Sequence, residues 1–174
     1  PLYKPEFGWE ELERSRQWAM RSIRNLNYSL DMKNLILRYT EALDQSNLND
    51  CVLRLWGIIE RITDTIGSNY DETTKRMSWV FKDRKLVREM LQAIRVRRNQ
   101  HVHSGRSAHD RDQVAYLAKY LLDPHILILL RNDFKVSSLE EYARVLALPE
   151  NYDILREMEK IYRMGARIEK AYGP

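Results

Sequence analysis

The stretch RRNQHVHSG, residues 97–105, gathers two arginines, an asparagine and two histidines within nine positions. Arginine offers a permanent planar charge to a phosphate, and histidine accepts or releases a proton near neutral pH. At about 100° per residue, Arg98 and His103 lie about 140° apart on a straight helix. Either the helix loosens before Gly105, or a pocket that uses both residues is shared with another copy of the chain.

Three of these residues stand in a more specific order. A polar residue, Asn99, directly follows Arg98, and His103 comes after four intervening positions. This order resembles the R-x4-H motif of HEPN-domain ribonucleases, most closely their Apea-like branch. The similarity in patterning spans about residues 50–130, where an apolar helical segment, VLRLWGIIERI, precedes the motif helix. The first forty-odd and the last forty residues carry no family resemblance.

The resemblance implies a metal-independent endoribonuclease that uses no cofactor and acts on single-stranded RNA. In that family the ribose 2′-hydroxyl attacks the adjacent phosphorus, and two copies pair their motif helices into a composite site, so a homodimer is expected. Carried to this sequence, the catalytic residues are Arg98, Asn99 and His103. A defence or toxin–antitoxin system, with a regulatory partner protein or domain, is the setting that the resemblance suggests.

The remaining polar residues near the motif are expected to guide the RNA backbone. This predicted RNA-binding set comprises Arg95, Arg97, His101 and Arg106. For Arg95 and Arg97, exposed helix arginines without a ligand are an equal interpretation. His101 leaves other registers open, in which Arg95 or Arg97 pairs with one of the histidines. We favour Arg98 with His103 because only this register places an asparagine directly after the arginine.

Other chemistries fit the sequence less well. The histidine pair in HVH and the dyad His109-Asp110 lack further ligands on separate helices, so no metal is expected. A Ser-His-Asp hydrolase would need a G-x-S-x-G turn, which the chain does not contain. Two binding functions stay open: a HEPN-like helical module that binds nucleotide, RNA or a partner protein without cleavage, and an unrelated helical interaction domain with a basic end.

Basic residues are concentrated around the motif. Between residues 82 and 106, eight basic residues outnumber two acidic ones, whereas the whole chain carries only +4. This excess suits a polyanionic partner, although a basic helix face is more often simply solvated. Arg84, Lys85 and Arg88 oppose the helix dipole at the start of the motif helix, which also favours a phosphate partner there. Glu60 lies in the apolar segment, where a buried carboxylate needs a partner. A motif arginine is one expected partner, and a surface position with a partner near Arg61 is an equal interpretation.

The elements that must position the motif are predicted to be helical throughout. Six glycines and five prolines separate stretches whose apolar residues recur every three to four positions, which predicts one all-α domain of seven to nine helices over 174 residues. Its HEPN-like core covers about residues 50–130. The expected core includes Trp56, Ile59, Ile62, Ile94 and Leu117. Helices are expected at 9–25, 31–45, 50–66, 71–81, 83–105 and 110–122. Asp123-Pro124 is expected to break the last of these, and another helix follows through ILILL. The final two helices are expected at 139–146, behind a Ser137-x-x-Glu140 capping box, and at 152–171.

Composition argues against a membrane protein. The longest aliphatic run, ILILL, is far shorter than the roughly 20 residues that a membrane span requires. The first twelve residues have no apolar core with a cleavage site, so a cytoplasmic location is expected. The lone Cys51 has no second cysteine for a disulfide or a metal knuckle, and we interpret it as a small buried hydrophobic residue.

Overall fold

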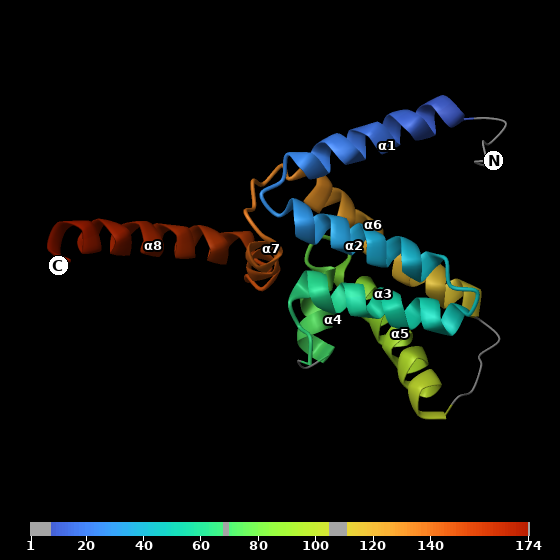
Figure 1. Cartoon of the computed structure of the whole chain (residues 1–174). Helices are drawn as coiled ribbons and strands as arrows, with labels where there is room; N and C mark the ends of the chain where they lie inside the picture. Colours follow the sequence, from blue (N-terminus) through green and yellow to red (C-terminus); the bar gives the residue numbers. More distant parts are fainter. Residues whose placement is uncertain (1–7, 68–69, 105–110, 174) are drawn as a thin grey trace.

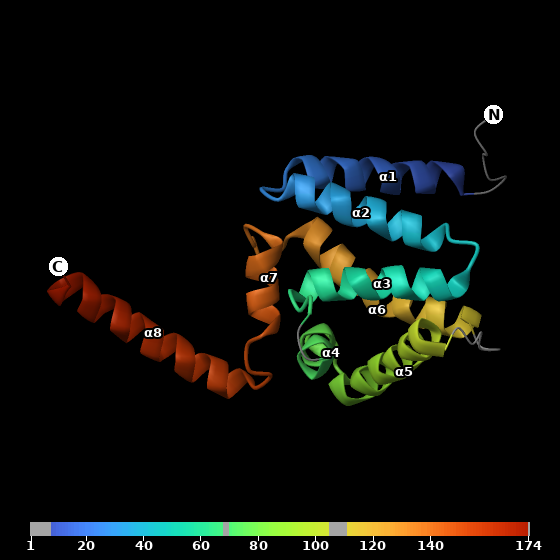
Figure 2. The same cartoon turned by 60° about the horizontal axis from the view of Figure 1, so that its bottom comes forward.

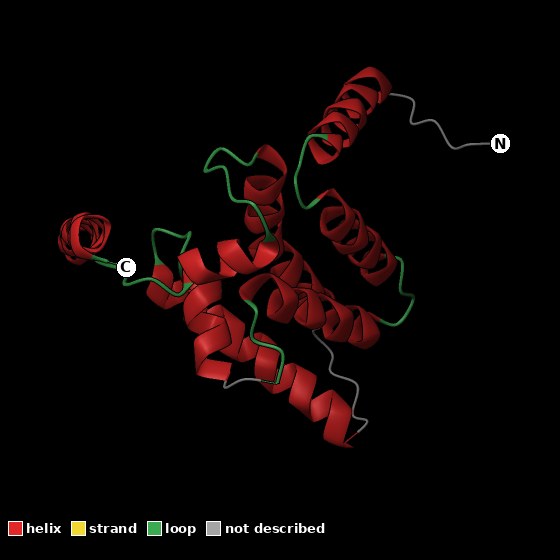
Figure 3. Cartoon of the chain, turned by 60° about the vertical axis from the view of Figure 1, so that its left-hand side comes forward, coloured by secondary structure: helices red, strands yellow, loops and turns green. Residues whose placement is uncertain are grey.

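All regular structure in the described part of the chain is helical (Figure 3). The structure, a computed structural model, describes residues 8–67, 70–104 and 111–173, and for residues 100–104 and 111 it describes the backbone only. This confirms the predicted all-α class. The eight helices in these ranges are α1 (Trp9–Arg24), α2 (Ser29–Leu43), α3 (Leu48–Thr63), α4 (Tyr70–Ser78), α5 (Arg84–Ser104), α6 (Arg111–Arg131), α7 (Leu139–Leu146) and α8 (Tyr152–Tyr172).

The core is built around α3, which lies between its neighbours in the middle of the bundle (Figures 1 and 2). Eight of its sixteen residues are buried, and Trp56, Ile59 and Ile62 are fully inaccessible, as predicted. Ile94 of α5 is fully buried as well. Leu117 was expected in the core but is only half-buried, because α6 turns other side chains toward α3: Ala115, Ala118, Leu121 and Leu122.

The expected break at Asp123-Pro124 does not occur, since Pro124 lies inside the continuous helix α6. A proline in a helix interior costs about 3 kcal/mol or more. Burial on both sides of it outweighs this local preference, since Leu121 and Leu129 are both fully buried. The Asp123 carboxylate also stabilises this part of α6. It accepts a hydrogen bond from Lys119 of the same helix at 2.6 Å and another from the Tyr39 hydroxyl of α2.

Several helix ends differ from the prediction by one to three residues. The cap of α3 is Asn47, whose side chain accepts from the Asn49 N–H at 3.0 Å, so the helix begins at Leu48 and not at residue 50. The same helix ends at Thr63, before Gly67, because Asp64 adopts the left-handed conformation (φ 50°) that Asp tolerates in short turns. The capping box of α7 lies one residue later than predicted: Ser138 accepts from the Glu141 N–H at 3.1 Å, and the Glu141 carboxylate accepts from the Ser137 N–H at 2.6 Å.

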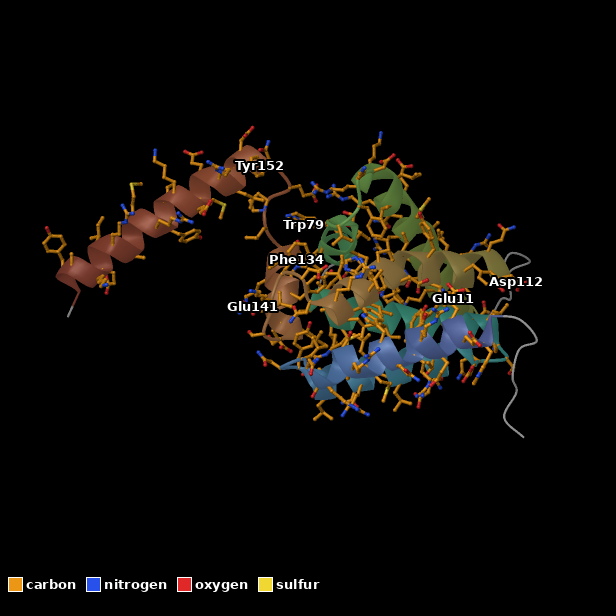
Figure 4. The ribbon with its side chains drawn as sticks, turned by 90° about the horizontal axis from the view of Figure 1, so that it is seen from above. Glu11, Trp79, Asp112, Phe134, Glu141 and Tyr152 are labelled. Carbon is orange, nitrogen blue, oxygen red and sulfur yellow. The ribbon has the colours of Figure 1, made fainter. Side chains whose placement is uncertain are left out.

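The last helix stands apart from the others. Asn151 caps α8 with two hydrogen bonds, to Asp153 N–H at 2.8 Å and Ile154 N–H at 3.2 Å, and the helix then runs away from the bundle (Figures 1 and 2). None of its side chains is buried. From Tyr152 onward its side chains reach into open space on every side (Figure 4). Across the described residues, no helix has the length and apolar character to cross a membrane.

Candidate active site

The motif lies in the last third of α5, and the register of this helix decides which residues face the bundle. Asp83 begins the helix by accepting a hydrogen bond from an N–H of the first turn at 3.0 Å. Val87, Leu91 and Ile94 are buried and follow one another at spacings of four and three. The next position of this stripe is Arg98, which is half-buried. A charged residue thus stands where the periodicity calls for an apolar one.

Tyr70, the first residue of α4, holds two of the motif arginines. Its hydroxyl accepts a hydrogen bond from Nη1 of Arg98, and the Arg98 guanidinium carbon lies 5.7 Å from the ring centre. The Arg95 guanidinium carbon lies 4.2 Å from the same ring centre, a cation–π contact. Arg95 also donates to Gln92 at 3.2 Å. No local sequence signal pointed to Tyr70, because its contact with Arg98 joins positions 28 residues apart.

The buried ring of Trp56 supports Tyr70 from the core side. The ring centre of Trp56 lies 6.0 Å from that of Tyr70, with the planes tilted by 49°. The indole N–H of Trp56 donates to the Glu60 carboxylate at 2.8 Å. Glu60, expected to pair with a motif arginine, therefore has a different partner, and its link to Arg98 runs through the two aromatic rings.

The joint between α3 and α4 fixes the position of Tyr70. The hydroxyls of Thr63, Thr65 and Thr73 form a buried chain with oxygen–oxygen distances of 2.8 Å. Arg76 closes the joint by donating to the Thr63 carbonyl at 2.9 Å. A buried network of hydroxyls whose hydrogen bonds are all satisfied favours a single arrangement. This network therefore fixes the position of α4 relative to the end of α3.

Arg98 has a side-chain donor that no described residue satisfies. Its Nη1 donates to the Tyr70 hydroxyl and, at 3.4 Å, to the side-chain oxygen of Asn99. Its Nε is buried and has no hydrogen-bond partner among the described residues. An unsatisfied buried donor costs about 1–3 kcal/mol. The described side chains therefore leave this N–H of Arg98 unsatisfied inside the protein.

The other predicted site residues are placed only in part. Arg97 is half-buried on α5, next to Arg98. His101 and His103 lie in the last turn of that helix, with side chains outside the described residues, and Arg106 lies outside them altogether. Because α5 stays helical through Ser104, it does not loosen before Gly105 in its described part. On a regular helix, position 101 shares the face of position 98, and position 103 lies about 140° away.

The basic residues at the start of α5 have protein partners. Arg84 donates to the Glu150 carbonyl at 2.8 Å, and Arg88 forms an ion pair with the Glu150 carboxylate. Arg88 also donates to the Ser78 hydroxyl at 3.0 Å. Because Arg84 and Arg88 have partners within the chain, their charges do not by themselves call for a phosphate at this end of the helix. Their charges tie α5 to the turn before α8.

A second candidate site is an open groove of about 610 Å³ along α2 and α3. Its floor includes Gly57, where a Cβ would have no neighbouring atom within 4 Å. Arg61 is paired with Asp31 at 3.5 Å and with Glu140 at 3.3 Å. Two more arginines line the groove and form no ion pair with a described residue: Arg38 and Arg54.

Of the two other histidines, His109 lies outside the described residues, and His125 of α6 is structural. It is fully buried, and its Nε2 lies 2.9 Å from the Met77 carbonyl, which can only accept. Nε2 therefore carries the proton, and Nδ1 accepts from the Tyr142 hydroxyl at 2.9 Å. Burial lowers the pKa of His125 to about 4, so the ring is neutral at pH 7. No cluster of three or more His, Cys, Asp or Glu suited to a metal ion occurs among the described residues.

Comparison of the chain with protein-family models, with curated proteins and with solved structures finds no match. The resemblance to HEPN ribonucleases thus rests on the order of Arg98, Asn99 and His103 and on their place at the end of a long helix.

Proposed function

We propose that this chain is a metal-independent endoribonuclease of HEPN type, which cleaves single-stranded RNA at a site shared by two copies. The observation that carries the proposal is the setting of Arg98. It occupies an inward position of α5, Tyr70 holds its Nη1, and its Nε lacks an acceptor among the described residues. Tyr70 thus fixes the direction of a half-buried guanidinium, and arginine is the side chain that binds phosphate oxyanions through parallel hydrogen bonds.

The reaction needs no external nucleophile. The ribose 2′-hydroxyl attacks the adjacent phosphorus, the bond from phosphorus to the 5′-oxygen breaks, and a 2′,3′-cyclic phosphate and a 5′-hydroxyl remain. His103 takes the proton of the 2′-hydroxyl, and a protonated imidazole returns one to the departing 5′-oxygen. Arg98 neutralises the charge that builds on the phosphate oxygens, with Asn99 beside it. Arg95, Arg97, His101 and Arg106 guide the RNA backbone.

The regular helix supports a site built from two copies. Because α5 stays helical through Ser104, positions 98 and 103 of one chain point in different directions. A second α5, packed against the first in a homodimer, brings His103 of one copy toward Arg98 of the other. The proposal extends to a cytoplasmic defence or toxin system in which a regulatory partner controls the dimer.

The test is cleavage of end-labelled single-stranded RNA in the presence of EDTA, with analysis of the product ends. The parent protein is expected to leave cyclic phosphates. His103→Ala should lower the rate by about 10²- to 10⁴-fold, because a general acid and base is lost. Arg98→Lys should be similarly inactive, because an ammonium cannot reproduce the planar fork.

His101→Ala is the matched control, since it removes an imidazole two residues away. It should retain most of the activity. If His101→Ala is inactive and His103→Ala is active, the catalytic pair is Arg98 with His101, which share one helix face. A parent protein that leaves RNA intact, or cleaves only with magnesium, contradicts the proposed mechanism.

The second candidate function is a helical module that binds a nucleotide or RNA without cleavage. The groove along α2 and α3 favours it, because Arg38 and Arg54 line it without acidic partners among the described residues. In that case the parent protein should bind labelled RNA and leave it whole. Binding should then fall with Arg38→Glu and Arg54→Glu and stay unchanged with Arg98→Ala.

A further inference from the structure

The helix α8 carries an apolar stripe that nothing in the described chain covers. The exposed fraction is 46% for Ile154, 54% for Ile161 and 61% for Ile168, and it reaches 86% for Tyr172. A helix of this length draws most of its stability from packing of its apolar face. Since α8 runs clear of the bundle, that packing must come from another molecule or segment (Figures 1 and 4).

The stripe has the spacing of a coiled-coil seam. Its residues follow one another at alternating intervals of four and three over nearly three heptads, and further apolar side chains widen it: Leu155, Tyr162 and Met164. The seam residues are Ile154, Met158, Ile161, Gly165, Ile168 and Tyr172. This pattern fits a partner that is itself a helix.

We propose that α8 pairs in antiparallel orientation with α8 of a second copy. The middle of the seam is residue 163, so a two-fold axis there places Ile161 of each copy opposite Gly165 of the other. A Cβ at Gly165 would meet no atom within 4 Å in the single chain, which leaves room for a large side chain. Parallel pairing would instead set glycine against glycine and leave a void in the seam.

The charge distribution along α8 favours the same orientation. Residues 152–162 carry three acidic and two basic side chains, whereas residues 163–172 carry three basic and one acidic. Antiparallel pairing sets the acidic half of each helix beside the basic half of the other, and it opposes the two helix dipoles. Parallel pairing would bring like halves together.

An anionic membrane surface fits this helix less well than a second copy. At about 100° per residue, Glu157 and Glu169 lie about 60° from the middle of the stripe, one on each side. The five basic residues of α8 lie about 120° or more from it on the same count. An interfacial helix needs basic side chains on its polar face within reach of the headgroups. Here the charges nearest the apolar stripe are acidic.

This pairing goes beyond the proposed ribonuclease and does not depend on it. The motif end of α5 and the free end of α8 lie at opposite ends of the molecule (Figures 1 and 2). A contact through α8 and a contact through α5 are therefore separate two-fold interfaces, which together give assemblies larger than a dimer. Loss of RNA cleavage does not report on α8, and loss of α8 pairing does not report on catalysis.

The test is the mass of the whole chain in solution, measured by light scattering at tens of micromolar. Ile161→Glu should halve the mass, because it buries a carboxylate in the seam. Ala166→Glu is the matched control, since it makes the same change of charge on the polar side of the same helix and should leave the mass unchanged. An unchanged mass for Ile161→Glu overturns the proposal, and so does an equal fall for both variants.

Gly165→Leu tests the orientation. Leucine is a better helix former than glycine and has open space around it in the single chain, so the helix itself should not suffer. In the antiparallel pair it collides with Ile161 of the second copy, and the mass should fall. Tighter association would establish the parallel arrangement instead. Flotation of the parent chain with vesicles containing phosphatidylserine, lost in Ile161→Glu, would assign the stripe to a membrane surface and overturn the pairing.

Discussion

The helices α3 and α8 have the same kind of sequence and opposite surroundings. Both carry apolar residues at intervals of three and four with polar residues on the other side. In α3 the apolar side is covered by neighbouring helices, and Leu55, Trp56 and Ile59 have no exposed surface. In α8 no residue is buried. Periodicity therefore identifies the face of a helix that needs cover, and it does not tell which molecule provides it.

The largest expected effect compares one truncation in each helix. Leu55→Ala should lower the free energy of unfolding by about 2–5 kcal/mol, because it empties a closed site in the core. Ile161→Ala should change bundle stability by less than about 0.5 kcal/mol, because more than half of that side chain is already exposed in the single chain. Denaturant unfolding followed by tryptophan fluorescence measures this, since every tryptophan lies outside α8.

Equal losses for the two variants would break the comparison. They would mean that α8 packs on its own bundle in solution. A small loss of unfolding free energy for Leu55→Ala would also contradict the comparison, since it would indicate that α3 is loosely packed.

Acid should destabilise the bundle through its buried histidine, His125, whereas α8 contains no histidine. Burial holds the pKa of His125 at about 4 in the folded protein, below its ordinary value of about 6.5. Between these values the unfolded chain binds a proton that the folded chain does not, so stability rises with pH. The free energy of unfolding should therefore fall by about 3 kcal/mol as the pH drops from about 6.5 to about 4.

The measurement is denaturant unfolding across this range for the parent protein and His125→Gln. The variant removes the titrating group, so its stability should depend less steeply on pH. Equal slopes would assign the acid sensitivity to carboxylates elsewhere in the protein.

The smallest expected effect concerns the edge of the bundle, where Tyr70 is only half-buried. Tyr70→Phe keeps the ring for Trp56 and Arg95 and removes the acceptor of the Arg98 bond. A loss of about 1 kcal/mol in unfolding free energy is expected. Tyr116→Phe is the control, because that residue is 71% exposed and should show no change.

Local pattern predicted the helices and most of the core, because each depends on neighbouring residues. The stripe of α3 and the Asp83 cap of α5 are of this kind. Pro124 was misjudged because its local preference is outweighed by packing around it. Tyr70 was missed because its partners lie on another helix, and the Glu150 pairing that occupies Arg84 and Arg88 joins positions more than sixty residues apart.

The tie at Glu150 fixes one end of α5, and the contact of Arg98 with Tyr70 fixes the helix near its other end. Arg84 and Arg88 clamp the start of α5 to Glu150, in the turn before α8. The 21 residues of α5 extend about 30 Å from this clamp to the end that carries the motif. A rotation of about 2° at the clamp displaces the tip of such a rod by about 1 Å. Misplacement on this scale can lower a catalytic rate about a hundredfold. The buried residues Leu91 and Ile94 lie between the clamp and the motif and oppose such a rotation, so the core keeps Arg98 in register with Tyr70.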